Sequence, residues 1–429
     1  MTPGRSRSAG PRIGRAIAAG AVALLVFHLL RTWVAERYLV PTESMEPTLH
    51  GDRERGDLVL VDKLGLVRSR APGALRRFDL VVVKDPESAH EHLVKRVVSM
   101  GDEELAILDG DLFVRRLGEA GPFVRIQKHP LEHRDMRMTF FAYPSSSPAS
   151  KHTSSRPPSG GEDPSEYLSF GAAEPGMIAL PLGAAEPAEL LRPYERERRR
   201  RASGGGPRGW QAPPSALRTT SPIDVSFLNA EGRRIAVGRG FDRDVGIEVT
   251  VALDDSLTGV CFALELRERM SDLSYTRDGR CMFHGASGAA LELRGPPLTG
   301  ERVEFTFGHL DGRVFFAVGD QLVVLAESPP VTDEPDDWPE NVLHFGVAGA
   351  AGDAQVSGVR LFHDVYYRPD AVAFAEPRYR VEPDSLFLLG DNSSYSVDSR
   401  RRGAFPVRGL AGRPLAVIGP WQRVRWLPR

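Results

Sequence analysis

Cysteine, lysine and long apolar runs are all scarce in this chain of 429 residues. Only two cysteines are present, Cys261 and Cys281, which excludes a disulfide-built scaffold and a cysteine-rich zinc site. A single disulfide between them stays open if that region lies outside the cytoplasm. The formal net charge of −2 argues against nucleic acid as a partner, because proteins that bind it usually carry a large basic excess. No spacing of His, Asp and Glu resembles a ligand set, so we expect neither a metal nor another cofactor.

The N-terminal region holds an apolar run, residues 16–30, which only His28 interrupts. Fifteen residues fall short of the roughly 20 that span a bilayer. Residues 32–35 can extend the span if Arg31 reaches the interface and Trp33 lies in it. Because the preceding residues 1–15 contain arginines and no acid, we expect them in the cytoplasm, residues 16–36 as a single-pass anchor in the cell (inner) membrane, and the rest outside. A cleaved signal peptide is the alternative, although the large and charged residues after the run make a poor cleavage site.

The remaining sequence predicts a mainly β protein built as one domain split by another. Residues 37–118 and 369–429 contain short β-branched runs bounded by Gly, Pro and Asp, and they are expected to pack together as the two halves of one domain. Residues 119–220 are expected to be a low-complexity and linker region. Within it, 144–165 should be a loose loop, 194–201 a solvated, charged helix end rather than a lipid-binding segment, and 202–214 a flexible linker.

Residues 221–368 form a second folded unit in this prediction. Strand-like runs recur there at regular spacing, separated by turn residues such as Asp311-Gly312, which is typical of an antiparallel β-sandwich. The stretch 305–318 resembles the jelly rolls of concanavalin-like and laminin-G-like domains. That resemblance implies a glycan or protein ligand for the insert, although fold alone does not give function. No compact set of acids stands out that would mark a glycosidase or a calcium site.

Lysine is rare enough to make individual lysines informative. The chain has five lysines against fifty arginines, and Lys95 lies in the apolar run Leu93–Val98 beside Arg96. On a strand, Leu93, Lys95 and Val97 share one face, so the amine is flanked by apolar side chains. Burial of this kind lowers the pKa of a lysine and can make it a general base, which an arginine cannot become. From periodicity alone, a strand lysine that points to solvent is the simpler interpretation.

Two further segments give this lysine a context. Residues 41–49 (PTESMEPTL) place Ser44 in a short turn between two prolines, and residues 390–400 (GDNSSYSVDSR) follow a buried-strand run. Together with Lys95-Arg96-Val97-Val98, these segments resemble type I signal peptidase, a membrane-bound serine endopeptidase. The resemblance covers residues 27–117 and 376–418, under a third of the chain.

The resemblance implies specific roles for residues of these segments. Ser44 would be the nucleophile and Lys95 its general base. The oxyanion would be held by the Ser44 backbone N–H and the Thr42 hydroxyl, where the family commonly has serine. Ser396 would hydrogen-bond the Lys95 amine and orient it.

The last segment would also supply supporting residues. Asp398 and Arg400 would form an ion pair close to the site, and Asp391 and Asn392 would shape the surrounding turn. Two departures from the family pattern affect the fine shape of the site. Arg401-Arg402-Gly403 follow Ser399-Arg400 where the family usually has aromatic residues and then glycine, and Tyr395 replaces a small polar residue.

The function expected from the resemblance is removal of signal peptides from exported preproteins, by a membrane-bound enzyme. An alternative from another class is a membrane-anchored carbohydrate-binding or scaffolding protein with a vestigial peptidase domain. The intact set Ser44, Lys95 and Ser396 argues against this alternative. The sequence leaves open whether the substrates are general or dedicated.

Overall fold

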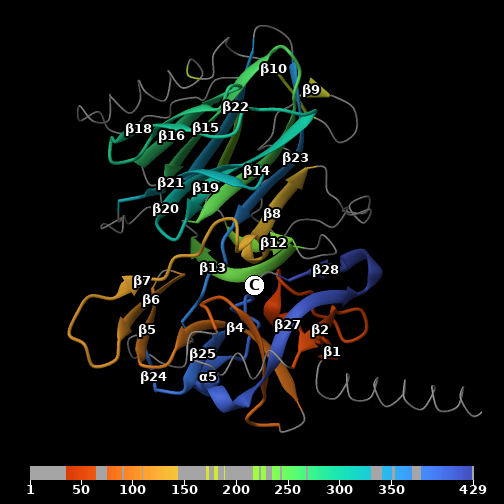
Figure 1. Cartoon of the computed structure of the whole chain (residues 1–429), viewed down its shortest axis with the longest axis vertical. Coiled ribbons are helices and arrows are strands. Elements are labelled where there is room, and N and C mark those ends of the chain that lie inside the picture. Colours follow the sequence, from red (N-terminus) through yellow and green to blue (C-terminus); the bar gives the residue numbers. More distant parts are fainter. Residues whose placement is uncertain are drawn as a thin grey trace, which may run out of the picture. The chain divides into compact units, whose positions relative to one another are not determined.

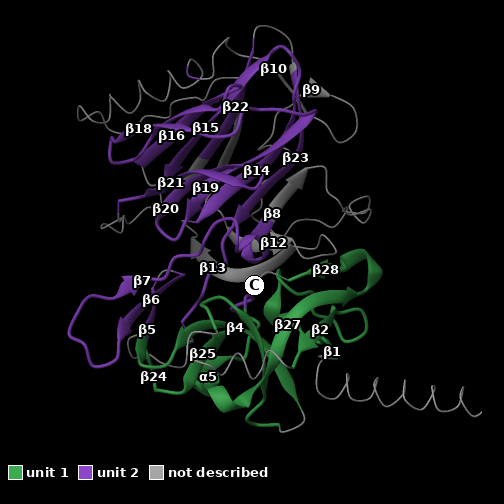
Figure 2. Ribbon diagram, in the orientation of Figure 1, with its two compact units in different colours: residues 1–104, 379–390, 395–429 green, residues 105–378, 391–394 purple. Residues whose placement is uncertain are grey.

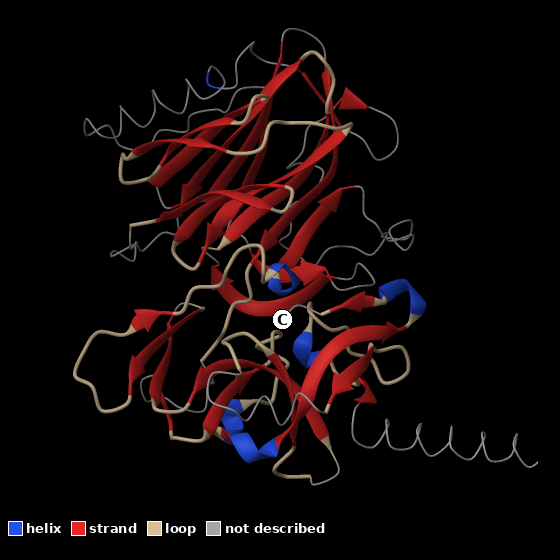
Figure 3. Cartoon of the chain, viewed as in Figure 1, coloured by secondary structure: helices blue, strands red, loops and turns tan. Residues whose placement is uncertain are grey.

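The computed structural model describes residues 35–63, 75–88, 91–108, 110–143, 171–172, 178–181, 188, 216–221, 224–228, 234–241, 244–266, 269–329, 341–349, 353–369 and 378–427. Strands dominate these residues, and the helices among them are short (Figure 3). The chain divides into two compact units (Figure 2). Unit 1 comprises residues 1–104, 379–390 and 395–429, and unit 2 comprises residues 105–378 and 391–394.

The expected anchor, residues 16–36, lies outside the described residues up to position 34. Its last two residues contradict the expectation, because Ala35 and Glu36 begin a strand that pairs Ala35 with Asp62 and Glu36 with Val61. No helix within the described part of the chain is long and apolar enough to cross a membrane. The segments expected to be loose or charged, 144–165, 194–201 and 202–214, also lie outside the described residues.

Unit 1 is built on one antiparallel sheet with the strand order β1-β2-β27-β3-β4-β25-β26, and β28 pairs with β27 (Figure 1). Its strands are β1 (Ala35–Leu39), β2 (Leu58–Asp62), β3 (Leu80–Lys84), β4 (His92–Met100), β25 (Ser385–Leu389), β26 (Phe405–Pro406), β27 (Leu410–Gly419) and β28 (Arg425–Trp426). Its helices are η1 (Glu43–Met45), α5 (Ser399–Arg402), η5 (Val407–Gly409) and η6 (Trp421–Arg423). Strands from both ends of the chain therefore alternate in one sheet.

Burial explains which strands lie at the centre of this sheet. Four consecutive residues of β3, Leu80 to Val83, are buried, as expected for a strand that is covered on both faces. The strand β2 instead alternates between buried and half-buried residues. One apolar cluster of the sheet contains Met45 and Leu49, so the segment after β1 is held to the core by its own side chains.

Unit 2 consists mainly of two antiparallel sheets, with the orders β21-β20-β19-β14-β23-β10-β9 and β11-β22-β15-β16-β17-β18. The strand β8 pairs with β23, β12 pairs with β13, and a small sheet has the strand order β24-β5-β6-β7. Its elements are β5 (Glu103–Leu108, which begins in unit 1), β6 (Asp111–Arg116), β7 (Val124–Arg125), η2 (Arg134–Met136), β8 (Met138–Tyr143), β9 (Gly171–Ala172), β10 (Ile178–Pro181), β11 (Ala216–Ser221), β12 (Asp224–Leu228), β13 (Arg234–Phe241), β14 (Val245–Ala252), β15 (Leu257–Leu266), β16 (Arg269–Thr276), β17 (Arg280–His284), β18 (Ala290–Arg294), β19 (Arg302–Leu310), β20 (Arg313–Val318), β21 (Gln321–Glu327), β22 (Asn341–Gly349) and β23 (Asp353–His363); β24 (Arg378–Val381) leads back into unit 1.

The core of unit 2 lies between its two large sheets and is centred on aromatic rings. The ring of Phe262 in β15 lies 5.3 Å from that of Phe307 in β19, 5.5 Å from Phe316 in β20 and 5.0 Å from Phe345 in β22. Because β15 and β22 belong to one sheet and β19 and β20 to the other, these contacts join the two layers. The predicted sandwich is thus built around a phenylalanine cluster.

Both cysteines belong to this sandwich and are free. Cys261 in β15 lies opposite Ser274 of β16, whereas Cys281 in β17 lies opposite Tyr275 of the same strand. The disulfide that the sequence left open is therefore not formed. Burial raises the pKa of each thiol to about 12, which keeps both protonated and unreactive near neutrality.

The units differ in extent from the sequence-based segments. Residues 105–118, assigned from sequence to the first half of the split domain, group with unit 2. Residues 119–143, assigned to the low-complexity region, contain β7, η2 and β8, and β8 pairs with β23 of the sandwich. The sequence pattern did not indicate these elements, because the short strands β7 and β8 lack a regular alternation of apolar and polar residues.

We predict that Phe262→Ala destabilises unit 2 strongly, because it empties a fully buried ring site that both sheets share. Comparable truncations cost about 3–5 kcal/mol. Leu291→Ala in β18, whose side chain is 42 % exposed, is the matched control and should cost far less. Chemical denaturation followed by circular dichroism measures both, and equal losses in the two variants would contradict this description of the core.

Candidate active site

The segment that carries Ser44 is a short, well-packed turn. It begins after β1, passes through the single 3₁₀ turn η1, and continues with a hydrogen bond from the Leu49 N–H to the Met45 carbonyl of 2.9 Å. Met45 and Leu49 are 1 % and 0 % exposed, respectively, and they fix this turn to the core of unit 1. The Ser44 residue itself is buried, with 8 % of its surface exposed.

Lys95 reaches this turn from the middle of β4. Its Nζ lies 2.8 Å from Ser44 Oγ, and the lysine is 3 % exposed. Its strand neighbours on the same side, Leu93 and Val97, pack in an apolar cluster of unit 1. The structure thus joins two residues 51 positions apart and gives the amine the buried setting that a neutral lysine requires.

Thr42 also contacts the nucleophile position. Its hydroxyl donates to Ser44 Oγ at 3.3 Å, a long hydrogen bond, while the threonine itself is exposed. The residue is therefore at the rim of the site, beside the oxygen that would react. Its predicted role toward an oxyanion stays a prediction.

Ser396 lies close to this group without making the bond that the resemblance implied. It is 4 % exposed, and its Oγ has no hydrogen-bond partner in the structure. The hydroxyl packs against Gly390: a Cβ added at this glycine would meet Ser396 Oγ at 2.3 Å and the Ser44 carbonyl oxygen at 2.4 Å. The expected hydrogen bond from Ser396 to the Lys95 amine is not formed, because the hydroxyl is directed at the glycine. The same contact explains why position 390 has room only for glycine.

Asp398 and Arg400 form the expected ion pair. Arg400 Nε lies 2.9 Å from Asp398 Oδ1, and Arg400 Nη2 lies 2.7 Å from Asp398 Oδ2, so the pair is bidentate and geometrically specific. The fully buried Asp398 carboxylate also accepts from the N–H of Gly390 at 3.0 Å and caps the short helix α5. The pair therefore fixes the start of the Gly390 turn rather than touching Ser44.

Asp391 and Asn392 are completely buried and group with unit 2. Neither polar atom of the Asn392 side chain has a hydrogen-bond partner in the structure. The neighbouring Ser393 Oγ accepts from the N–H of Arg368 at 2.8 Å, which ties this turn to the segment after β23. The predicted role of Asp391 and Asn392, to shape the turn, agrees with their burial and stays untested.

A buried lysine amine at hydrogen-bond distance from a serine hydroxyl is the arrangement that Ser/Lys hydrolases use. Comparison with known proteins agrees with this class. Residues 13–147 match the family model described as signal peptidase, peptidase S26. Signal peptidase I of Bacillus caldolyticus is 34% identical over 110 residues, which are 26% of this chain and 55% of the relative.

Other relatives carry the same name over shorter stretches. Signal peptidase I of Mycobacterium tuberculosis (strain ATCC 25618 / H37Rv) is 42% identical over 69 residues, 16% of this chain and 22% of the relative. Over residues 13–147 the chain is thus similar to the signal peptidases. The chain spans about half or less of the length of these two relatives, and the matches leave most of unit 2 uncovered.

Solved structures resemble the chain only weakly. A galectin from the sponge Cinachyrella sp. has a TM-score of 0.22 at 10% identity and covers 28% of this chain and 92% of its own. The carbohydrate-binding module CBM66 from Bacillus subtilis has a TM-score of 0.20 at 14% identity and covers 34% of this chain and 94% of its own. At these scores we draw nothing from either about ligand or fold.

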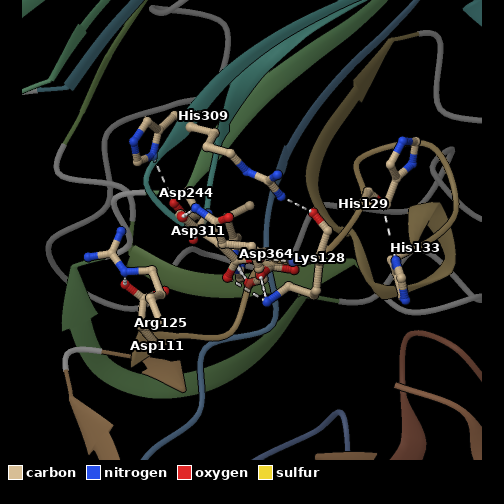
Figure 4. Close-up of polar contacts among 12 residues, drawn as sticks. Asp111, Arg125, Lys128, His129, His133, Asp244, His309, Asp311 and Asp364 are labelled. Atoms are coloured by element: carbon tan, nitrogen blue, oxygen red, sulfur yellow. Dashed lines mark hydrogen bonds and ion pairs between the residues drawn. The ribbon is translucent and has the colours of Figure 1, made fainter. Parts of the chain in front are cut away.

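A second polar cluster, which sequence analysis missed, lies in unit 2 (Figure 4). Oxygens of Asp111, Asp244 and Asp311 lie within 4.8 Å of one another, close enough for a hard cation to bridge them. These acids are far apart in the sequence, so no spacing pattern could have indicated them. The sequence-based expectation that no compact set of acids stands out did not anticipate this cluster.

Cationic side chains already accompany these acids. Lys128 Nζ lies 2.7 Å from Asp311 Oδ1 and 2.7 Å from Asp364 Oδ2, all three residues being buried. His309 Nδ1 lies 2.8 Å from Asp244 Oδ1. The cluster is hence an internal ion network that joins the segment before η2 to the ends of the sandwich strands.

The electrostatics of this network reflect a shortage of positive charge. Burial raises the pKa of the Asp364 carboxyl well above its usual value despite the nearby Lys128 ammonium, and it raises that of Asp311 as well. Burial by itself would lower the pKa of Lys128, but attraction to Asp311 and Asp364 outweighs it and holds the pKa well above its ordinary value. The shared ammonium of Lys128 remains charged, while the carboxyls of Asp311 and Asp364 retain protons more readily.

We predict that Lys128→Met destabilises unit 2 by about 3–5 kcal/mol near neutral pH, because buried carboxylates lose their cation. A carboxyl whose pKa is raised in the folded state stabilises the fold at low pH. This contribution is lost as the pH rises from the pKa of the carboxyl in the unfolded state towards its higher pKa in the folded state. The loss of stability caused by Lys128→Met should therefore be larger at pH 8 than at pH 5.

Hydrogen exchange of unit 2 peptides, measured by mass spectrometry at the two pH values, checks this prediction. Arg280→Met, which removes an exposed ion pair with Asp278, is the control and should change little at either pH. A loss in Lys128→Met that is equal at both pH values would contradict the account of the network.

Proposed function

We propose that this chain is a membrane-bound serine endopeptidase that removes signal peptides from exported preproteins. The observation that supports this most directly is the 2.8 Å contact between the buried Lys95 amine and the Ser44 hydroxyl. The family match over residues 13–147 supports the same class of substrate.

In this proposal Lys95, in its neutral form, removes the proton from Ser44 Oγ as this oxygen attacks the scissile carbonyl carbon. A tetrahedral oxyanion forms, and its collapse breaks the C–N bond while Lys95 returns the proton to the leaving amine. Water, deprotonated by the same amine, then cleaves the Ser44 ester and releases the new carboxylate. The burial of Lys95 supports this role, because burial disfavours the charged ammonium, and only the neutral amine can accept the proton.

The oxyanion would be held by the Ser44 N–H and the Thr42 hydroxyl. The 3.3 Å contact from Thr42 to Ser44 Oγ supports this assignment, since it keeps the threonine hydroxyl beside the reacting oxygen. One such donor can be worth about 3–4 kcal/mol in the transition state. Asp398 and Arg400 would maintain the turn at Gly390 that packs behind Ser44.

The bilayer is the second proposed partner. Residues 16–34 would anchor the chain, and the substrate would bind as an extended strand with small residues before the cut, by pairing with a strand edge. Two tryptophans near the C-terminus, Trp421 and Trp426, are 86 % and 79 % exposed, which supports contact with an interface that tryptophan favours. The sandwich of unit 2 would serve as a glycan-binding or protein-docking module, whose ligand is open.

We predict that Ser44→Ala and Lys95→Met each reduce cleavage of a model preprotein by at least ~10³-fold, because one removes the nucleophile and the other its base. Lys84→Met, at the exposed end of β3, removes the same type of side chain outside the site and should leave the rate unchanged. The measurement is preprotein cleavage in detergent, with circular dichroism to verify folding. Cleavage at the same bond by folded Ser44→Ala would refute the proposal.

A further inference from the structure

The C-terminal segment of unit 1, residues 420–427, lies against the turn that carries Ser44. It follows β27, forms η6 and then β28, and pairs back with β27 through Val417–Arg425 and Ala416–Trp426. Its last described residue, Leu427, is 6 % exposed and belongs to the same apolar cluster as Met45 and Leu49. The segment thus shares a core with the nucleophile turn.

Two arginines of this segment converge on one buried carboxylate. Asp57 is 0 % exposed, and Arg423 Nε donates to its Oδ1 at 2.6 Å. Arg425 Nη2 lies 3.6 Å from Asp57 Oδ2, and the same oxygen accepts from the backbone N–H of His50 at 3.1 Å. The two arginines therefore hold the carboxylate that fixes the end of the nucleophile turn.

Arg425 also contacts the turn directly. Its Nη2 donates to the carbonyl oxygen of Thr48 at 2.5 Å, and the backbone of Asp57 donates to the His50 carbonyl at 2.8 Å. Arg423 donates in addition to the carbonyl of Arg55. The C-terminal segment thereby contacts this part of the chain at positions 48, 55 and 57, and Asp57 in turn holds the backbone of His50.

We propose that Arg423 and Arg425 are positioning residues, which hold the turn 44–50 so that Ser44 Oγ stays within reach of the Lys95 amine. The proposal rests on the proposed function. Neither arginine touches the Ser44 hydroxyl, and both act through Asp57 and the Thr48 carbonyl. A misplacement of about 1 Å in a catalytic group can cost about 10²-fold in rate, so loosening this clamp should be visible in kcat.

The experiment compares wild type with the double variant Arg423→Met/Arg425→Met in preprotein cleavage. We expect kcat per folded molecule to fall about 10- to 100-fold with KM changed less than about threefold, since the turn and not the substrate contact is loosened. Arg425→Lys should recover most of the loss seen in Arg425→Met, because one amine can replace the single Nη2 atom that serves both Thr48 and Asp57. Arg380→Met, which breaks an exposed ion pair with Glu382, is the matched control.

Hydrogen exchange of peptic peptides within residues 38–53 provides a readout that does not depend on activity. The double variant should exchange faster there, while the amides of β3 and β4 keep their wild-type rates. Unchanged exchange in this segment, a kcat per folded molecule within twofold of wild type, or an Arg425→Lys variant as slow as Arg425→Met would each overturn the proposal. If wild type cleaves no preprotein, the proposed function fails, and the exchange result alone decides whether the clamp exists.

Discussion

The hydrogen bond between the Lys95 amine and the Ser44 hydroxyl requires that unit 1 hold a buried lysine side chain against the turn that carries Ser44. Taking an amine out of water is costly, and a long flexible side chain loses rotamer freedom when it is fixed. Both costs are met by the surrounding sheet, in which β4 lies between β3 and β25 and presents the lysine from a buried strand. The side chains of Met45 and Leu49 pack the Ser44 turn against the apolar core, and Asp57 accepts a hydrogen bond from the backbone of His50 at the end of the turn.

The sheet explains how distant parts of the sequence form one unit. β27, from the end of the chain, pairs with β2 and β3 from its beginning, and β25 pairs with β4. Unit 2 lies between these segments in the sequence, and its two ends meet in an antiparallel bridge between Gly110 and Tyr367. An insertion whose ends lie close together can be accommodated without separating the strands on either side of it.

Sequence patterns predicted those elements that are decided locally. The buried-strand run expected before residue 390 forms β25, and the regular strand runs expected in the second folded unit include β20. Ser44 and Lys95 were found through a motif resemblance, and the fold then placed them in contact.

Features that depend on long-range packing were missed. β16 was not expected, because the buried polar residues Ser271, Asp272 and Ser274 interrupt its apolar pattern. β17 was not expected either, because it is short and begins and ends with the polar residues Arg280 and His284. The network at Lys128 and the clamp at Asp57 each join residues more than a hundred positions apart, which no spacing in a single sequence can reveal. Ser396 lies beside the Ser44 turn without the hydrogen bond to Lys95 that the resemblance implied, because its hydroxyl packs against Gly390.

The central claim is that Ser44, activated by Lys95, attacks the peptide bond and becomes acylated. Its most direct test is rapid quenching of wild-type enzyme with an excess of preprotein-derived peptide, followed by mass spectrometry of the tryptic segment 38–53. The account predicts an acyl adduct on Ser44 that forms and decays at rates compatible with turnover, and no adduct in Lys95→Met. Steady cleavage with the adduct on another residue, or with an unmodified Ser44 under conditions that trap acyl enzymes, would contradict it.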